Sequence, residues 1–584
     1  MLLVDRTFLS WLLLLLLATC QSGVRPANAQ PAEGRQDVAA AKVDEIFAQY
    51  NKPGSPGCAV GVYREGGLLY SRGYGEADLE RGVRITPATV FYIASTAKQF
   101  TAMSVWLLAR QNRLSLDDDV RKYIPELPNY GTPITVRHLL NHTSGLRDYT
   151  DLLELAGHSP EEVSTNADIL ALTVRQKRLN FQTGTAHQYT NSNYILLAEI
   201  LKRVSGQTLR EFARVNIFDP LGMKSTQYVD DHTQVIPNRA VGYAATGEGK
   251  YVIAISNAER IGPAGLYTTI EDLARWDQNF YSGAVGGKDL LEKMTTPGRL
   301  SDGKVIDYAS GLMPGTYRGA HTVRHSGHSI GYRSEFLRFP TLRFSVATLC
   351  NDESNARPER LAERVADVYL GDRLSTADGS MNQPSSPGQN PAPVSAQQMA
   401  GALGDYWNPQ TGEVRQLVLR SGQPVYIIDS WSRARLTAIS PTQFRFGRNE
   451  ITITPSRGGK KILTLRWYDG RVETYEELQR VKLTPVQLAK YAGRYYSAEL
   501  DAEYLLETRD GGLVLKRKNQ EDRQMLPTVR DSFSEGGIRV RFLRDGGGRL
   551  SGFLFGEGDL SDLQFEPDCR HVPKGGQTTP AGKQ

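Results

Sequence analysis

The stretch "FYIASTAKQF", residues 91–100, places Ser95 three residues before Lys98, with only small residues between them. In a helix, residues three apart lie on the same face, so the spacing predicts a serine hydroxyl beside a lysine side chain. A serine becomes a nucleophile when a neighbouring base takes its proton, and a lysine can be that base when burial lowers its pKa. The alternative is a helix-start serine with a solvated lysine. The pair alone leaves both interpretations open, because about two such pairs are expected by chance in a chain of this length.

Two further motifs add polar side chains that suit catalysis. In "HQYTNSNYILLAEI", residues 187–200, Tyr189 and Asn191 stand directly before a predicted helix. An aromatic residue and an asparagine there are also typical of core packing and a helix cap. In "RHSGHSIGYRSEF", residues 324–336, His325 and Gly327 open a predicted strand, where a glycine lets a substrate backbone approach, although glycines at strand starts are common.

The order of hydrophobic patterns predicts one sheet with helices packed on it. A helix over 40–51 precedes two alternating segments, "PGCAVGVYREG" and "GLLYSRGYG", which form a hairpin pattern. Helical periodicity follows at 95–111, 135–142, 191–205 and 208–216. Strand patterns return at 328–340 and 342–352, before a last amphipathic helix at 356–370. Because strands come first and last, we expect the two groups to join into one antiparallel sheet.

The last third of the chain reads as a separate, repeated β structure. Residues 374–394 are rich in Ser, Pro, Asn and Gly, which is typical of a linker. Beyond it, "SAQQMAGALGDYW" at 395 and "TPVQLAKYAGRYY" at 484 align at an offset of 89 residues. The alternating strands after each copy predict two antiparallel β-barrels, over 395–482 and 483–570, with a tail at 571–584. A single large sandwich is the alternative.

The N-terminus carries a targeting pattern. Arg6 precedes the apolar run "FLSWLLLLLLAT", which is short for a bilayer span and is followed by "ANA" at residues 27–29. The pattern predicts a signal peptide over 1–29 and a periplasmic or secreted protein. Lipid attachment at Cys20 and a retained membrane anchor are the alternatives.

Composition and charge exclude several classes of function. The chain has 584 residues, 40% hydrophobic and 23% charged, which indicates a globular protein of several domains. Its 69 basic and 64 acidic side chains are interspersed and give a net charge of +5, so no nucleic-acid partner is expected. No cysteine or histidine cluster has metal-ligand spacing, and we expect no metal site.

Taken together and in this order, the three motifs resemble those of the serine β-lactamase and penicillin-binding protein superfamily. The pattern is most similar to the class C-like branch, which includes D-aminopeptidases, D-alanyl-D-alanine carboxypeptidases and lactamase-fold esterases. Three further segments resemble that branch: "LLNHTSGL" at 139–146, "FDPLGMKST" at 218–226 and "GPAGLYTTIEDLARW" at 262–276. The resemblance covers 40–373 and implies an α/β (α+β) β-lactamase-like catalytic domain over 30–373, ahead of two lipocalin-like barrels.

The resemblance implies a role for each matched residue. Ser95 would attack a carbonyl and form an acyl-enzyme. Lys98 and Tyr189 would share the proton transfers, with either as the immediate base. Asn191 would hydrogen-bond Lys98 and the substrate amide. No metal or organic cofactor is implied.

The third motif departs from the pattern of many family members and bears on the substrate. The backbone N–H groups of Ser95 and of His328, one residue past Gly327, would form the oxyanion hole. Many lactamases and carboxypeptidases have "KTG" where this chain has "HSG", and their lysine helps to bind a substrate carboxylate. His325 is mostly neutral near pH 7, so we expect weaker carboxylate recognition here.

Two features favour a D-aminopeptidase-like hydrolase of small amides or esters, with a small molecule or a short peptide as its substrate. D-aminopeptidases of this superfamily carry "HxG" and follow the catalytic domain with two barrels, which is also the layout predicted from the repeat. A lactamase-fold esterase, a carboxypeptidase and a β-lactamase stay open, as does a non-catalytic protein that binds cell-wall fragments. The barrels are either structural or send a loop to the active-site mouth. Oligomeric state is not predicted.

Two cysteines fall on the first and last strands of the expected sheet. Cys58 and Cys350 lie on neighbouring strands in this fold. Because cysteine pairs on adjacent strands rarely suit disulfide geometry, we expect free buried thiols rather than a bridge.

Overall fold

The computed structural model describes residues 32–159, 161–375, 394–428, 432–456, 459–467, 471–558 and 560–568. The predicted signal peptide 1–29, the predicted tail 571–584 and most of the predicted linker 374–394 lie outside these ranges. Within them, no helix is both long enough and apolar enough to cross a lipid bilayer.

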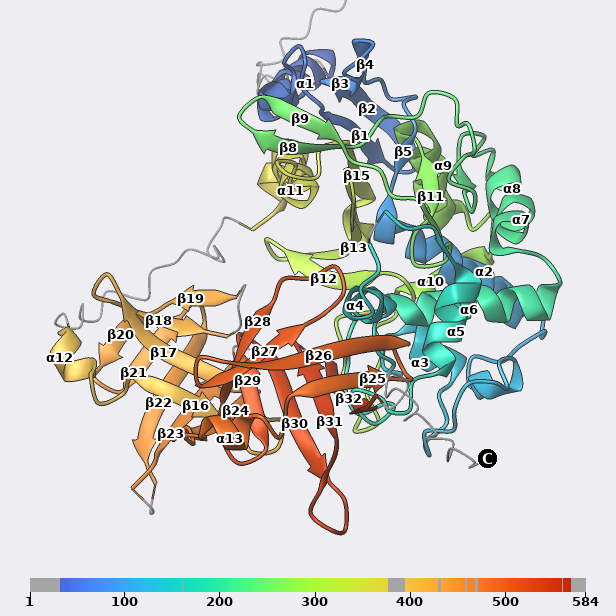
Figure 1. Cartoon of the computed structure of the whole chain (residues 1–584). Coiled ribbons are helices and arrows are strands. Elements are labelled where there is room, and N and C mark those ends of the chain that lie inside the picture. Colours follow the sequence, from blue (N-terminus) through green and yellow to red (C-terminus); the bar gives the residue numbers. More distant parts are fainter. Residues whose placement is uncertain are drawn as a thin grey trace, which may run out of the picture.

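A six-stranded antiparallel sheet forms the centre of the first domain (Figure 1). Its strands, in spatial order, are β12 (Met313–Tyr317), β13 (Ala320–Ser329), β14 (Tyr332–Phe339), β15 (Phe344–Cys350), β1 (Cys58–Arg64) and β2 (Gly67–Tyr74). The predicted joining of the early and late strands is confirmed, because β1 pairs with β15 along its whole length.

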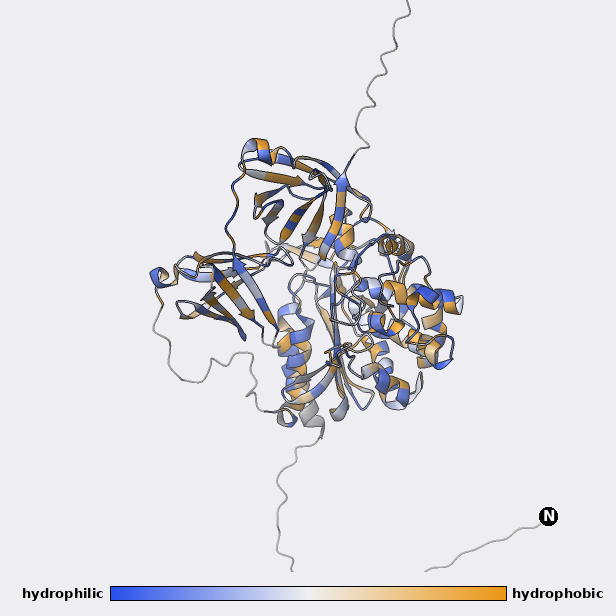
Figure 2. Cartoon of the chain, turned by 90° about the horizontal axis from the view of Figure 1, so that it is seen from below, coloured by the Kyte–Doolittle hydropathy of each residue, from blue (hydrophilic) through white to orange (hydrophobic). Residues whose placement is uncertain are grey.

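Helices cover both faces of this sheet. On one face, α1 (Ala32–Phe47) and α11 (Pro358–Leu370) pack on the sheet around Val60, Phe344 and Val365. On the other face lie α2 (Lys98–Arg110), α9 (Ile270–Ser282) and the remaining helices, whose core includes Phe100 and Trp276. Figure 2 shows hydrophobic and hydrophilic residues interspersed along the helices and strands, and helix α11 buries the side that carries Leu361 and Val365. Strand β15, inside the sheet, is buried on both sides.

The helices expected from periodicity are present. The first runs over Ala32–Phe47 rather than 40–51, and the others differ by at most a few residues at their ends. Between α2 and β12, the described α-helices are α3 (Val136–Leu140), α4 (Tyr149–Leu155), α5 (Asn166–Val174), α6 (Asn191–Ser205), α7 (Leu209–Ala213), α8 (Asp219–Leu221), α9 and α10 (Gly287–Thr295). Helix α6 has the predicted bounds because Thr190 caps its start and Gly206 ends it in a left-handed conformation. The prediction that His325 and Gly327 open a strand is wrong. Strand β13 begins at Ala320 because its first half pairs with β12.

The C-terminal third forms two antiparallel β structures (Figure 1). The first is a nine-stranded sheet that curls almost into a barrel, formed by β16 (Gly404–Trp407), β17 (Val414–Arg420), β18 (Gln423–Ile427), β19 (Arg433–Arg435), β20 (Thr437–Ser440), β21 (Gln443–Phe446), β22 (Asn449–Pro455), β23 (Lys461–Arg466) and β24 (Val472–Glu477). The second is a closed barrel of β25 (Gly493–Ser497), β26 (Ala502–Arg509), β27 (Gly512–Lys516), β28 (Arg523–Pro527), β29 (Ser532–Glu535), β30 (Ile538–Arg544), β31 (Leu550–Glu557) and β32 (Leu560–Pro567).

The internal repeat is confirmed at the level of single hydrogen bonds. Each barrel begins with a capped helical turn, α12 (Ala396–Met399) or α13 (Pro485–Leu488), and both turns have a capping box. The Tyr406 hydroxyl donates to the carbonyl of residue 402, and the Tyr495 hydroxyl donates to that of residue 491. Both tyrosines are buried. The same local hydrogen bond from a buried tyrosine therefore occurs in each copy of the repeat.

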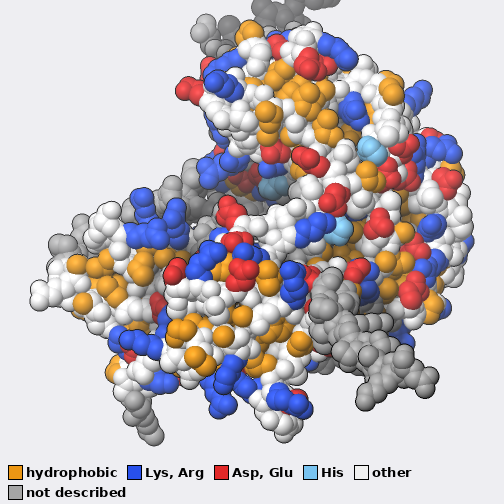
Figure 3. Space-filling view, in the orientation of Figure 1, with side chains coloured by type: hydrophobic (Ala, Val, Ile, Leu, Met, Phe, Trp, Pro, Cys, Tyr) orange, Lys and Arg blue, Asp and Glu red, His pale blue; other side chains and the backbone are white. Residues whose placement is uncertain are grey.

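The second barrel packs directly on the first domain. One hydrophobic cluster contains Tyr149, Leu152 and Ile195 of the first domain together with Tyr504 and Phe565 of the barrel. Figure 3 shows the surface hollowed between the first barrel and the first domain, whereas the second barrel is in close contact with it. The first domain and the second barrel thus share a core.

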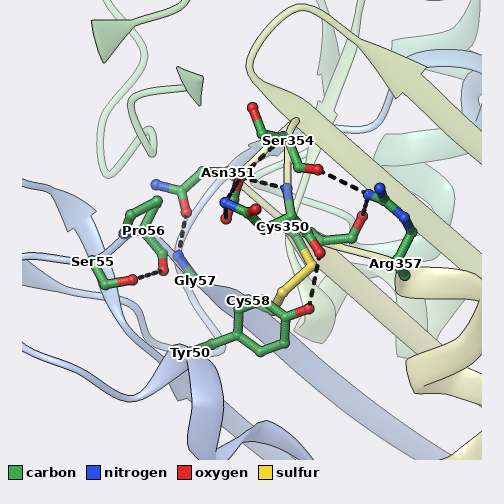
Figure 4. The surroundings of a disulfide bond; sticks show 12 residues. Tyr50, Ser55, Pro56, Gly57, Cys58, Cys350, Asn351, Ser354 and Arg357 are labelled. Atoms are coloured by element: carbon green, nitrogen blue, oxygen red, sulfur yellow. Dashed lines mark hydrogen bonds between the residues drawn. A yellow bond between two sulfur atoms is a disulfide. The ribbon is translucent and has the colours of Figure 1, made fainter. Parts of the chain in front are cut away.

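A disulfide joins Cys58 and Cys350, so the expectation of free thiols is wrong (Figure 4). The two residues are direct partners in the β1–β15 register. The Asn351 N–H donates to the Gly57 carbonyl, which makes Cys58 and Cys350 a non-hydrogen-bonded pair. In such pairs the Cα atoms come closest, here to 4.0 Å, and the two sulfur atoms meet.

Because the disulfide closes a loop with a sequence separation of 292, we expect it to stabilise the first domain. A variant with Cys58→Ser and Cys350→Ser should lose about 2–4 kcal/mol of unfolding free energy. Thermal denaturation with and without reductant measures this, and only the wild type should respond to reductant. Alkylation of both cysteines in unreduced, denatured wild type would contradict the bridge.

Candidate active site

Ser95 lies on a short 3-10 turn, η2 (Ala94–Ala97), that joins β5 (Phe91–Tyr92) to α2. Ser95 is half-buried, whereas Lys98, the first residue of α2, is buried. Ala94 has a φ of 47°, a left-handed conformation that costs a non-glycine residue about 1–3 kcal/mol. Strain of this kind clusters at functional sites, and here it immediately precedes the candidate nucleophile.

Strands β13 and β14 hold this turn in place. The Ser334 hydroxyl donates to the Ile93 carbonyl at 2.8 Å. A Cβ atom at Gly327 would lie 2.2 Å from the Ile93 carbonyl oxygen and 2.4 Å from the Ser334 Oγ. Gly327 is therefore required because β13 passes directly against the turn that carries Ser95, a reason that the sequence motif did not supply.

The Lys98 amine has three neighbours. Its Nζ lies 3.0 Å from the Ser95 Oγ, 2.8 Å from the Asn191 Oδ1 and 3.0 Å from the Pro263 carbonyl oxygen. Both carbonyl-type oxygens can only accept a hydrogen bond, whereas the Ser95 hydroxyl can also donate one. A neutral Lys98 that donates its two protons to Asn191 and Pro263 therefore has its lone pair available for the Ser95 hydroxyl.

Burial lowers the pKa of Lys98 to about 7, and the Asp148 carboxylate opposes this by raising it. At neutral pH a substantial fraction of Lys98 is consequently uncharged. A base with a pKa near the working pH combines availability with proton affinity, which is the condition for general-base catalysis.

Asp148 is a site residue that the sequence motifs did not indicate. Its Oδ2 accepts hydrogen bonds from the Asn191 backbone N–H at 2.5 Å and from the Asn191 Nδ2 at 3.2 Å. Because the Asn191 amide donates to Asp148, its oxygen faces Lys98. Asp148 follows the segment "LLNHTSGL" almost directly, but nothing in its spacing marked it as a partner of residue 191.

Tyr189 lies above Lys98, with the Lys98 Nζ 4.7 Å from the centre of its ring. Burial raises the pKa of Tyr189, and the Ser95 hydroxyl opposes this. The Tyr189 hydroxyl is buried and has no hydrogen-bond partner among the described residues. It is thus a protonated donor beside Ser95 rather than a ready base.

His142 packs under Tyr189, with ring centres 4.4 Å apart. Its Nδ1 accepts from the Thr190 backbone N–H and from the Asn193 side chain, both at 3.2 Å. Burial keeps the pKa of His142 well below its usual range, with Lys98 the second cause, so the ring is neutral. His142 belongs to the segment "LLNHTSGL", whose resemblance to the family assigned it no role. Its ring contact identifies it as a support for Tyr189.

His325 is buried and neutral. Burial, followed by the nearby Lys98, lowers the pKa of His325 to about 3. Its Nδ1 donates to the Ser326 carbonyl at 2.6 Å, and its Nε2 accepts from the Tyr308 hydroxyl at 3.2 Å. Both ring nitrogens are occupied, and His325 offers no positive charge to a substrate.

His328 stands at the end of β13, and its side chain points to solvent. The exposed imidazole pairs with Glu359 of α11 at 2.6 Å. The His328 side chain is thus held by α11 rather than by Ser95 or Lys98. The structure brings Ser95, Lys98, Tyr189, Asn191 and His325 together, and the contact of Gly327 with Ile93 places β13 beside them.

Among the described residues, one group has the side chains for a metal ion. Asp231, His232 and Glu259 place their ligand atoms within 4.8 Å of one another on the surface. The His232 Nδ1 already pairs with Glu259 at 2.7 Å. Sequence spacing did not indicate this group, and nothing else marks it as a binding site.

Comparison with known proteins gives relatives of similar length. The chain is 28% identical over 513 residues to a D-aminopeptidase of Gluconobacter oxydans, which covers 84% of this chain and 92% of the relative. It is also 28% identical over 522 residues to a D-aminopeptidase of Brucella melitensis, which covers 86% of this chain and 93% of the relative. Both alignments extend from the catalytic domain into the barrels.

A solved structure shares the fold. The octameric penicillin-binding protein homologue from Pyrococcus abyssi matches 84% of this chain and 99% of its own, with a TM-score of 0.51 and 20% identity. The family comparison matches residues 43–370, more than half of the chain, to the family described as Beta-lactamase. This protein therefore belongs to the β-lactamase family.

Proposed function

We propose that this protein is an exported serine hydrolase that cleaves small amides through an acyl-enzyme on Ser95. One observation carries the proposal. The Lys98 Nζ lies 3.0 Å from the Ser95 Oγ. Of the three hydrogen-bond partners of this nitrogen, only the Ser95 hydroxyl can give it a proton, because the other two are carbonyl oxygens.

In the first step, the Ser95 Oγ attacks the substrate carbonyl carbon while its proton passes to Lys98. Asn191 and the Pro263 carbonyl fix the lysine in place. The leaving amine takes a proton from Tyr189, whose raised pKa keeps the phenol protonated until then, and Lys98 restores it. The acyl group is thereby left as an ester on Ser95.

The oxyanion of the tetrahedral intermediate is assigned to two backbone N–H groups, those of Ser95 and His328. The contact of Gly327 with the turn at Ile93 sets the spacing between strand and turn. Preorganised donors of this kind lower such barriers by a few kcal/mol. Water then hydrolyses the ester with the same residues in reversed proton roles.

The substrate class follows from the charge of the site. His325 is neutral and fully hydrogen-bonded, so a substrate carboxylate finds no cation there. This favours amides or short peptides without a carboxylate at the scissile end. The choice of D-amino acids rests on the relatives named D-aminopeptidase.

Export is proposed on two grounds. The first 29 residues have the pattern of a signal peptide, with lipidation at Cys20 as the alternative. The Cys58–Cys350 disulfide is of a kind that persists in oxidising compartments such as the periplasm.

Replacing the nucleophile tests the acyl-enzyme. We expect Ser95→Ala to lower kcat/KM for D-alanine p-nitroanilide by about 10³-fold or more and to abolish labelling by a fluorophosphonate probe. Ser282→Ala, at the exposed end of α9, is the control and should still be labelled. Equal labelling of wild type and Ser95→Ala would exclude Ser95 as the nucleophile. Absence of both labelling and hydrolysis in wild type would favour a non-catalytic binding protein.

The pH profile tests the base. Because protonated Lys98 cannot accept the Ser95 proton, kcat/KM should rise with pH through about 7. The Asp148 carboxylate raises the pKa of Lys98, so Asp148→Asn should move the midpoint to lower pH. Initial-rate measurements of kcat/KM between pH 5 and 9 give the midpoints for wild type and for Asp148→Asn. A wild-type profile that is flat over that range would contradict a lysine base.

A substrate panel tests the proposed specificity. We expect hydrolysis of D-alanine p-nitroanilide to exceed that of its L-isomer, of nitrocefin and of a D-Ala-D-Ala peptide by about tenfold or more in kcat/KM. p-Nitrophenyl acetate reports any esterase activity. Preference for nitrocefin or for the D-Ala-D-Ala peptide would reject the aminopeptidase assignment.

A further inference from the structure

Residues 147–149, here called the strap, lie across the start of α6 and are tied to it by four hydrogen bonds. Asp148 accepts from the backbone and side-chain N–H groups of Asn191. The Ser192 hydroxyl donates to the Arg147 carbonyl at 2.7 Å and accepts from the Tyr149 N–H at 2.9 Å. The strap therefore sets the position of Asn191, which holds Lys98.

The side chain of Arg147 extends from the strap into the second barrel. Its Nη1 donates to the Glu499 Oε2 at 2.8 Å, and its Nη2 donates to the Ser561 carbonyl at 2.6 Å. The same Nη1 also donates to the Gln176 Oε1 at 2.9 Å. The Arg147 side chain is 0% exposed and that of Glu499 is 2% exposed, so water does not screen this ion pair.

Glu499 is itself fixed from both domains. Its Oε2 also accepts from the Lys177 backbone N–H at 2.9 Å, and its Oε1 accepts from the Gln564 backbone N–H at 3.2 Å. The barrel thus presents a carboxylate in a defined position. A buried guanidinium without this carboxylate is strongly unfavourable, so Arg147 would leave the site or draw in water.

We propose that Glu499 of the second barrel is a positioning residue for the active site and acts through Arg147 and the strap on Asn191 and Lys98. This inference rests on the proposed function. It assigns the barrel a part in catalysis that needs no contact with the substrate.

Two other hydrogen bonds join the second barrel to the catalytic domain away from the strap, and they supply a matched control. The Tyr504 hydroxyl donates to the Leu155 carbonyl at 2.9 Å, and Asn519 donates to the Gly157 carbonyl at 2.8 Å. Both bonds reach the far end of α4 and the loop after it. Removing either weakens docking without touching the strap.

The test compares Glu499→Gln with Tyr504→Phe in the full-length protein. For Glu499→Gln we expect kcat on D-alanine p-nitroanilide, per fluorophosphonate-titrated site, to fall about 10- to 100-fold with KM within about twofold of wild type. Tyr504→Phe should keep kcat within about twofold. Glu499→Asp, which keeps the charge, should recover part of the loss.

The pH profile separates positioning from a loss of folded protein. The titratable groups that face Lys98 are Asp148, His142, His325, Tyr189 and Tyr194, and Asp148 is the carboxylate that raises the pKa of Lys98. When the strap moves, Lys98 loses the carboxylate that raises its pKa, so the kcat/KM midpoint of Glu499→Gln should move to lower pH. A smaller folded fraction would leave that midpoint unchanged.

Failure of the positioning role can be told apart from failure of the proposed function. Wild-type kcat and midpoint in Glu499→Gln, or an equal loss in Tyr504→Phe, would overturn the positioning role. If Glu499→Gln does not fold, the double variant Arg147→Gln/Glu499→Gln replaces it, because it removes the ion pair without leaving either charge buried alone. An unchanged labelling rate of Ser95 in that double variant would also overturn the role. Labelling does not depend on substrate class, so it decides the matter even where the anilide is not cleaved.

Discussion

The active site depends on keeping a lysine amine away from water while satisfying its hydrogen bonds. Lys98 is buried, and burial is the first cause of its lowered pKa. Asn191 from α6 and the Pro263 carbonyl accept its protons, so two segments far from Ser95 in sequence must converge on one nitrogen atom. The antiparallel sheet contributes to this arrangement, because β13 packs at Gly327 directly against the Ile93 carbonyl of the turn that carries Ser95.

Much of the fold was predictable because it follows from local patterns. The bounds of α6 come from Thr190 and Gly206, which act within a few residues of the helix. The two barrels follow from a repeat whose equivalent residues, such as Tyr406 and Tyr495, make equivalent hydrogen bonds. The pairing of β1 with β15 follows from the order of strands and helices along the chain.

The unpredicted features are contacts whose partners share no sequence pattern. Asp148 was missed because its bond to Asn191 depends on how a loop crosses a helix end. The disulfide was predicted wrongly because the distance between neighbouring strands alternates from pair to pair, and sequence does not say which type of pair Cys58 and Cys350 form. The strand start at Ala320 was missed because its cause is a partner, β12, with little alternation of its own.

The ion pair between Arg147 and Glu499 has a consequence for biosynthesis. The two residues are 352 positions apart, and Arg147 is 414 positions from Ser561, which accepts its second bond. N-terminal domains leave the ribosome first and begin to fold before the rest of the chain exists. During that interval the first domain contains Ser95 and Lys98, but the Arg147 guanidinium lacks its partner carboxylate, Glu499. The last domain to be translated is the one that supplies it.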